Sequence, residues 1–216
     1  HRYRGNSYNV LEAYRGAALE GYDFVHLVEE DVFVGRDYFE FHRDAHALVP
    51  DAFSVSACRN QQFNVADDPA YDEAAIYSHD SYQSLGVSFR SDVLADAVAG
   101  VGPEYHRDMI AYCRRTFPRS LIPRGNAEQD GLMHRKQEEL GLKTVYASAP
   151  RAYHAGFVGY HRRGVVSVAG PIWERAEKLL AMSSAELNAQ SDDYKDHASI
   201  ALDEPRAAVR HVIDWP

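Results

Sequence analysis

The chain has 216 residues, of which 45% are hydrophobic and 25% charged, and its formal net charge is −9. This is the composition of an ordinary globular protein, and the length suffices to bury one core. The negative charge argues against a broad nucleic-acid-binding surface, although it is compatible with a local basic patch. No apolar run reaches the length of a membrane span, and the first residues do not resemble a signal peptide.

The two cysteines predict a reducing compartment. Cys58 and Cys113 are far apart and lack the spacing of metal ligands, so they are expected to be buried free thiols. The chain contains no Asn-x-Ser/Thr glycosylation sequon. These features together predict a cytoplasmic protein.

The first elements in chain order are a helix, a buried strand and a group of acids. The helix should begin near Asn6, with Asn6 or Ser7 as its cap, and end at Gly21, a glycine placed for the left-handed conformation. Its apolar stripe consists of Val10, Leu11, Tyr14, Ala17 and Ala18. A strand over 24–28 follows at once and leads into three consecutive acids. A second helix is predicted over 38–48, ended by Pro50, and a second strand over 53–58.

The middle of the chain predicts two short strands and three helices. The strands, over 74–77 and 84–89, could pair as a hairpin. Helices are predicted over 91–98, over 103–117, and from a cap at Asn126 to Gly141. The 103–117 helix should turn four residues inward: Met109, Ile110, Tyr112 and Cys113.

Two more strands and a last helix complete the pattern. The strands are predicted over 143–147 and 150–154, and the helix over 172–182. Helices alternating with buried strands predict an α/β fold whose central, mostly parallel sheet is flanked by helices. Residues 183–216 are expected to form a tail that packs on the domain 1–182 or caps a site.

The acids Glu29, Glu30 and Asp31 are the first candidate site. They follow a strand at the end where open α/β sheets bind ligands. Glu29 and Asp31 should share one face of the extended chain, with Glu30 on the other. They could form an oxygen-ligand site for Mg²⁺ or Mn²⁺ that holds a phosphorylated substrate. The alternative is a solvated acidic turn.

Three further candidates follow along the chain. Glu128 and Asp130 begin a helix, where a carboxylate could act as a general base or could simply interact favourably with the helix dipole. His154 ends a strand and could be a metal ligand, a phosphate contact or an ordinary solvated histidine. A glycine-rich loop carries basic residues that suit a diphosphate or merely form an exposed turn; these are His161, Arg162 and Arg163.

Other common catalytic motifs are absent from the sequence. There is no Walker A loop, no G-x-G-x-x-G and no serine in a nucleophile elbow. Covalent nucleophilic catalysis is therefore not expected.

The order of these motifs resembles that of the GT-A-fold glycosyltransferases. Residues 24–31 are similar to the strand that ends in the Asp-x-Asp-type motif of that fold. Residues 29–39 resemble the Glu-Asp-Asp motif and following segment of inverting enzymes like N-acetylglucosaminyltransferase I. Residues 128–131 resemble the helix start that carries the catalytic base, and residues 153–159 resemble the strand and loop after it. The likeness covers about residues 6–165, the greater part of a GT-A-like catalytic domain.

The resemblance implies a metal-dependent, inverting hexosyl- or N-acetylhexosaminyltransferase that uses a nucleotide-sugar donor. Asp31, with His154, would bind Mn²⁺ or Mg²⁺. Glu29 and Glu30 would lie on the donor side, together with His161, Arg162 and Arg163 at the diphosphate. Asp130 would be the base, with Glu128 as its rival. Three residues between the acidic sites are assigned to the acceptor: Tyr82, Gln83 and Gly86.

Several points depart from the family or stay open. The motif is Glu-Glu-Asp, and no counterpart of the family's N-terminal donor-base strands precedes it in the given sequence. Either the protein lacks these strands or they lie outside this stretch. The acceptor could be a saccharide, a lipid-linked saccharide, a protein or a modified nucleobase. Two other activities remain alternatives: a nucleotidyltransferase-like enzyme and a non-catalytic nucleotide-sugar-binding domain.

Overall fold

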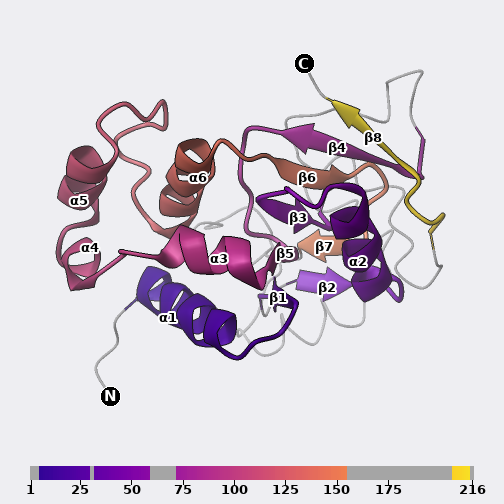
Figure 1. Ribbon diagram of the computed structural model, residues 1–216, viewed down its shortest axis with the longest axis horizontal. Helices are drawn as coiled ribbons and strands as arrows, with labels where there is room; N and C mark the ends of the chain where they lie inside the picture. Colours follow the sequence, from indigo (N-terminus) through magenta and orange to yellow (C-terminus); the bar gives the residue numbers. More distant parts are fainter. Residues whose placement is uncertain (1–4, 30–31, 59–71, 155–205, 215–216) are drawn as a thin grey trace, which may run out of the picture.

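A computed structural model describes residues 5–29, 32–58, 72–154 and 206–214 (Figure 1). The described helices are α1 (Asn6–Leu19), α2 (Tyr38–Leu48), α3 (Ser91–Val98), α4 (Pro103–Arg107), α5 (Met109–Thr116) and α6 (Gln129–Leu140). The described strands are β1 (Phe24–Leu27), β2 (Val32–Val34), β3 (Ser54–Ser56), β4 (Ala75–His79), β5 (Val87–Arg90), β6 (Thr144–Ala147), β7 (Ala152–His154) and β8 (His211–Asp214). None of these helices is long and apolar enough to cross a membrane.

The α/β expectation is confirmed, and the main sheet is mixed. Its six strands run in the order β1-β5-β3-β6-β4-β8, and β2 and β7 form a separate two-stranded ribbon. Parallel pairing, which the sequence predicts for most of the sheet, occurs between β3 and β6 and between β4 and β8. The other three pairs of the sheet are antiparallel.

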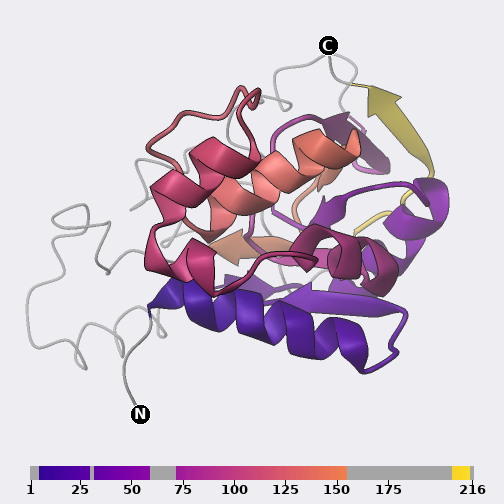
Figure 2. The ribbon, with the colours of Figure 1, turned by 60° about the vertical axis from the view of Figure 1, so that its left-hand side comes forward.

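Two hydrophobic clusters form the core. One joins α1, α3, α4, α5 and α6 to the sheet through strand residues such as Val25 and Phe89. The other joins α2 to the sheet through Val55 and Val145. Alternate residues of a strand point to opposite faces, so a central strand contributes to both clusters. Figures 1 and 2 show α1, α3 and α6 gathered on one side and α2 apart from them.

Two predictions about the strands are wrong. β1 lies at the edge of the sheet and pairs with β5 alone, so only Val25 of its four residues is buried. β4 and β5 do not form a hairpin, because β3 and β6 lie between them in the sheet. Both errors concern partners far away in the sequence.

The helix predicted over 103–117 is two helices. Asp108 is extended between α4 and α5, and its carboxylate accepts a hydrogen bond from the Ala111 N–H at 2.9 Å, as an N-cap residue does. Of the four residues expected inward, Tyr112 and Cys113 are buried, but Ile110 is 42% exposed. At α6, Glu128 rather than Asn126 occupies the N-cap, while Gly141 ends the helix in the left-handed conformation, as the sequence predicts.

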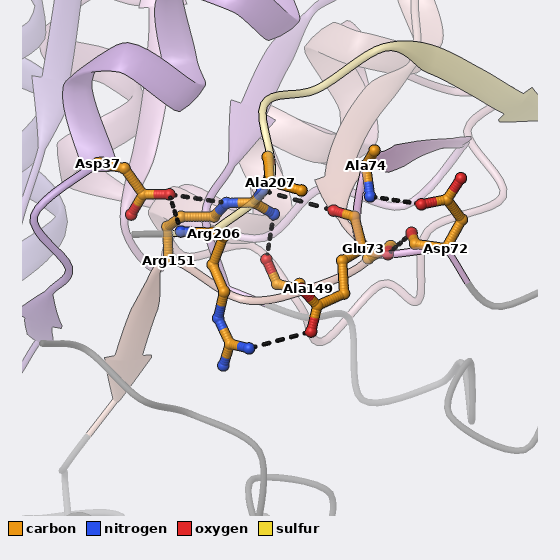
Figure 3. A network of polar contacts seen from close by, with 9 residues as sticks. Asp37, Asp72, Glu73, Ala74, Ala149, Arg151, Arg206 and Ala207 are labelled. Atoms are coloured by element: carbon orange, nitrogen blue, oxygen red, sulfur yellow. Dashed lines mark hydrogen bonds and ion pairs between the residues drawn. The ribbon is translucent and has the colours of Figure 1, made fainter. Parts of the chain in front are cut away.

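A buried arginine fastens the C-terminal segment to the domain (Figure 3). Arg151 is 1% exposed and donates a hydrogen bond to the Ala207 carbonyl at 2.8 Å, and its Nε lies 3.4 Å from an Asp37 carboxylate oxygen. The guanidinium group of Arg206 pairs with the Glu73 carboxylate at 3.1 Å, and the backbone N–H of Arg206 donates a hydrogen bond to the Asp37 carboxylate. Part of the predicted tail therefore belongs to the sheet as β8, while residues 183–205 lie outside the described part.

Three histidines and a serine fill the space between α2 and the sheet; we call them the histidine cluster (His26, His42, His46 and Ser88). The Ser88 hydroxyl lies 2.6 Å from His42 Nδ1 and 2.9 Å from His46 Nε2. Burial lowers the pKa of all three imidazoles, that of His46 to about 4. The cluster is therefore neutral at pH 7, and the hydroxyl can donate to one ring and accept from the other.

Candidate functional site

The β1 end that should carry the acids is partly described. Glu29 is half-buried, and its carbonyl accepts a hydrogen bond from the Val32 N–H at 3.0 Å, which closes the turn into β2. Its negative charge raises the pKa of Tyr14 and of Cys58. Glu30 and Asp31, the next two residues of the sequence, lie outside the described residues.

The β2–β7 ribbon places His154 at this turn. Val32, the residue after Asp31, pairs with His154 in the antiparallel ribbon. The Gly35 N–H donates to the Arg151 carbonyl at 2.8 Å and closes the other end. The backbone of His154 therefore lies beside Val32, where β2 begins. The predicted diphosphate contacts, His161, Arg162 and Arg163, lie outside the described residues.

The start of α6, with the candidate base, is held from several directions. The Gln129 N–H donates to Ser7 Oγ of α1 at 3.1 Å, and the Tyr105 hydroxyl of α4 donates to the Ala127 carbonyl at 2.9 Å. Ser7, expected as a cap of its own helix, thus serves another one. These contacts from α1 and α4 fix the position of the first turn of α6, in which Asp130 is the second residue.

The packing at the start of α6 requires a glycine at position 131, which the sequence analysis does not predict. A Cβ atom there would lie 2.1 Å from the Asn126 carbonyl oxygen, which no real Cβ tolerates. Arg135, one turn later and 3% exposed, donates to the carbonyls of both Asn126 and Gly131. The glycine lets the chain before α6 press against the helix. A glycine in the first turn of a strong helix was the available signal.

Asp130 is an exposed residue whose carboxyl group has a raised pKa. Desolvation by the surrounding protein raises its pKa, the nearby side chains of Ser84 and Gln129 lower it, and the charge of Glu128 raises it. Desolvation prevails, although the residue as a whole is exposed. A carboxylate with a raised pKa on an exposed residue suits a general base. Glu128, also exposed, makes no cap hydrogen bond with its side chain.

Two buried tyrosines lie beneath Asp130, and with Ser84 they form what we call the base cluster (Tyr14, Tyr82, Ser84 and Asp130). The hydroxyls of Tyr14 and Tyr82 are 3.3 Å apart. Burial raises the pKa of both phenols, and the charge of Asp130 raises both further. Glu29 also raises the pKa of Tyr14, so this phenol is within electrostatic reach of both candidate acids. Tyr14 was predicted only as part of an apolar stripe.

The three residues assigned to the acceptor are not in one place. Tyr82 belongs to the base cluster, and Gln83 beside it is half-buried. Gly86 is buried with a φ of +54°, and a Cβ there would lie 2.9 Å from that of Ala152. The close approach of β7 accounts for this glycine.

A metal site cannot be assembled from the described residues alone. No group of three or more histidine, cysteine, aspartate or glutamate side chains among them could hold an ion. Asp31, the predicted principal ligand of the metal, lies outside the described residues. The oxygen donors at this turn nevertheless have the chemistry that Mg²⁺ and Mn²⁺ prefer, and Mg²⁺ needs only one or two carboxylates when substrate phosphates and water complete its shell.

Comparison with known proteins assigns no family. No family model matches the chain, and no curated protein matches it. Any function must therefore be argued from the residues of the site.

Proposed function

We propose that the protein is a metal-dependent, inverting glycosyltransferase that moves a sugar from a nucleotide-sugar donor to an acceptor hydroxyl. The main support is the convergence of two acids from distant parts of the chain. Glu29, after β1, and Asp130, at the start of α6, both raise the pKa of the same buried phenol, that of Tyr14. The motif order of GT-A-fold enzymes, which the sequence resembles, gives these two acids different roles.

Asp130 is the base in this proposal. It accepts the proton of the acceptor hydroxyl while that oxygen forms a bond to the anomeric carbon, and the bond from this carbon to the diphosphate breaks on the opposite side. Its raised pKa makes this carboxylate a stronger base than an ordinary aspartate, and the exposure of the residue lets an acceptor approach it. Ser84 holds the carboxylate through a hydrogen bond. Tyr82, and Gln83 at the surface, would line the acceptor side.

The acidic turn is the donor side. Asp31 and His154 would hold Mn²⁺ or Mg²⁺, and Glu29 would contact the ribose or a metal-bound water. The ribbon pairing of Val32 with His154 supports a common site for these residues. When bound, the cation would neutralise negative charge on the departing nucleoside diphosphate. His161, Arg162 and Arg163 would contribute positive charge to the same group.

The test is a thermal-shift survey with UDP-, GDP- and TDP-sugars, with and without Mn²⁺, followed by donor turnover. We expect one donor to raise Tm only when the metal is present, and Asp31→Asn to abolish slow donor hydrolysis without unfolding the protein. Stabilisation by nucleoside triphosphates alone would instead favour a nucleotidyltransferase. Donor binding without any turnover would favour a binding domain.

A further inference from the structure

The region from α4 to the start of α6 carries an excess of positive charge in an acidic protein. Residues 103–126 contain five arginines and two acids, whereas the chain has a net charge of −9. All five arginines are exposed. We give the name basic–apolar surface to the exposed arginines and the two exposed large aliphatic residues of this segment: Arg107, Ile110, Arg114, Arg115, Arg119, Leu121 and Arg124. Figures 1 and 2 show α4, α5 and the connector after α5 together at one end of the molecule.

Most of this charge is not neutralised within the described part of the chain. Arg115 pairs with Glu104 at 3.5 Å, and both side chains are exposed. Across the described ranges, the other four arginines of the surface have no carboxylate partner within ion-pair distance. Arg107 and Arg115 line one hollow with the acids Glu104 and Asp108. An external anion is therefore the natural counter-charge for Arg114, Arg119 and Arg124 above all.

Apolar side chains stand among these arginines. Leu121 is 89% exposed, the highest value among the large hydrophobic residues that the structure describes, and Ile110 is 42% exposed. Ile110 and Arg114 are four residues apart and thus lie on one side of α5. Leu121 lies two residues after Arg119 and three before Arg124, in the connector.

The connector is held in place although its leucine is exposed. Buried Arg135 donates to the Pro123 carbonyl at 3.0 Å and to the Ile122 carbonyl at 3.3 Å. The Leu121 N–H donates to a Glu138 carboxylate oxygen at 2.9 Å. Leu121 therefore stands on a fixed backbone that presents it to the surroundings. This arrangement leaves apolar area in water that a partner could cover.

We propose that the basic–apolar surface binds the headgroup region of an anionic lipid bilayer. Arginines attract anionic headgroups, and an exposed leucine and isoleucine can enter the boundary with the acyl chains. Single-stranded nucleic acid fits less well, because it is usually held by exposed aromatic rings, and the tyrosines and phenylalanine of this region (Tyr105, Tyr112 and Phe117) are buried.

Lipid binding would also select the acceptor. Arg135 joins the connector to the first turn of α6 through the carbonyls of Asn126 and Gly131, on either side of Asp130 in the sequence. A membrane-bound protein would thus keep the candidate base near the bilayer surface. If the proposed glycosyl transfer holds, the acceptor class is a lipid-linked saccharide. This consequence rests on the proposed function, but the lipid binding itself does not.

The experiment is co-sedimentation of the whole protein with vesicles of phosphatidylcholine alone or with added phosphatidylglycerol, without donor. We expect binding to the anionic vesicles only, weakened by salt. Arg119→Glu/Arg124→Glu should weaken it more than roughly tenfold, since each arginine near such a surface contributes measurably. Leu121→Gln should weaken it roughly fivefold by removing the inserted apolar group.

Matched controls lie elsewhere on the molecule. Leu19 is 86% exposed at the end of α1, and Arg43 is exposed on α2, so Leu19→Gln and Arg43→Glu should leave vesicle binding unchanged. The proposal is overturned if wild-type protein ignores anionic vesicles at low salt, if the controls weaken binding as much as the surface variants, or if single-stranded DNA or an acidic peptide binds this surface while vesicles do not. Because no donor is present, these outcomes are independent of any failure of glycosyl transfer.

Discussion

Titratable side chains gather on both faces of β5, but water reaches them differently. On one face, the base cluster keeps an exposed aspartate above two buried tyrosines. On the other, the histidine cluster is closed between α2 and the sheet, with His42 and His46 at most 3% exposed. Burial acts on both by disfavouring charge, which raises the pKa of the acid and lowers that of the histidines.

This contrast separates a candidate site from a structural cluster. A perturbed pKa alone marks both places. Only the base cluster combines it with solvent access and a neighbouring acid, Glu29, from another segment. In the histidine cluster, Ser88 serves one ring nitrogen each of His42 and His46, and protonating the cluster would place like charges side by side. We therefore expect chemistry on one face and acid sensitivity on the other.

The largest expected effect is on activity at the base cluster. Asp130→Asn should lower kcat about a thousandfold, within the usual range for removing a general base, while donor-induced stabilisation persists. Tm at pH 7 should not fall, because burial disfavours the charge that the change removes. Glu128→Gln, two residues before Asp130, is the matched control and should retain activity. Equal losses in the two variants would contradict the assignment.

The histidine cluster should make the fold sensitive to acid. The folded-state pKa values lie below the unfolded value of 6.5, so the unfolded chain binds more protons as pH falls. The free energy of unfolding should drop between pH 6.5 and about 4, and His46 alone accounts for about 3 kcal/mol over that window.

Urea unfolding across this pH range measures the effect. His46→Gln keeps a hydrogen-bonding group near Ser88 but cannot take up the proton, so its stability should depend less on pH between 6.5 and 5. Parallel curves for variant and wild type would contradict the account of the histidine cluster.

Gly131 tests the packing beneath the base. Gly131→Ala should lower the free energy of unfolding by about 2 kcal/mol, because its Cβ would meet the Asn126 carbonyl. Gly16→Ala, in the exposed part of α1 where nothing lies within 4 Å, should instead stabilise the protein slightly. Urea denaturation of both variants measures the difference; a stable Gly131→Ala protein would mean that α6 starts differently.

The smallest effect concerns the tyrosine pair. Tyr82→Phe should lower the free energy of unfolding by about 1 kcal/mol, since it removes the hydrogen bond to the buried Tyr14 hydroxyl. Tyr22→Phe, at a position that is 67% exposed, should have no effect. Thermal melts compare the two. Equal stability of both variants would show that the phenols do not support the base cluster.

Local features of the fold could be predicted from the sequence, whereas distant pairings could not. The pattern over 38–48 gave α2 its observed bounds, and Gly141 marked the end of α6, because these signals act within a few residues. The break at Asp108 also has a local signal, because aspartate favours the N-cap position of a helix. The placement of β3 and β6 between β4 and β5 depends on contacts that no local pattern encodes.

The candidate site divides in the same way. Asp130 and Glu29 stood out because acids at element ends are conspicuous in a sequence. Tyr14 was hidden in a helical stripe, since a tyrosine at core spacing does not reveal that its hydroxyl meets Tyr82, 68 positions away. The histidine cluster had a partial signal, His42 and His46 four residues apart on α2, but its link to Ser88 is non-local.

The stereochemistry of donor hydrolysis tests the central claim most directly, because it needs no knowledge of the acceptor. An α-linked nucleotide-sugar donor is incubated with the protein and Mn²⁺, and the anomer released first is identified by NMR before it equilibrates. In-line attack assisted by Asp130 predicts the β-anomer, formed only with metal and not by Asp130→Asn. Initial release of the α-anomer, or unchanged hydrolysis by Asp130→Asn, would contradict the account.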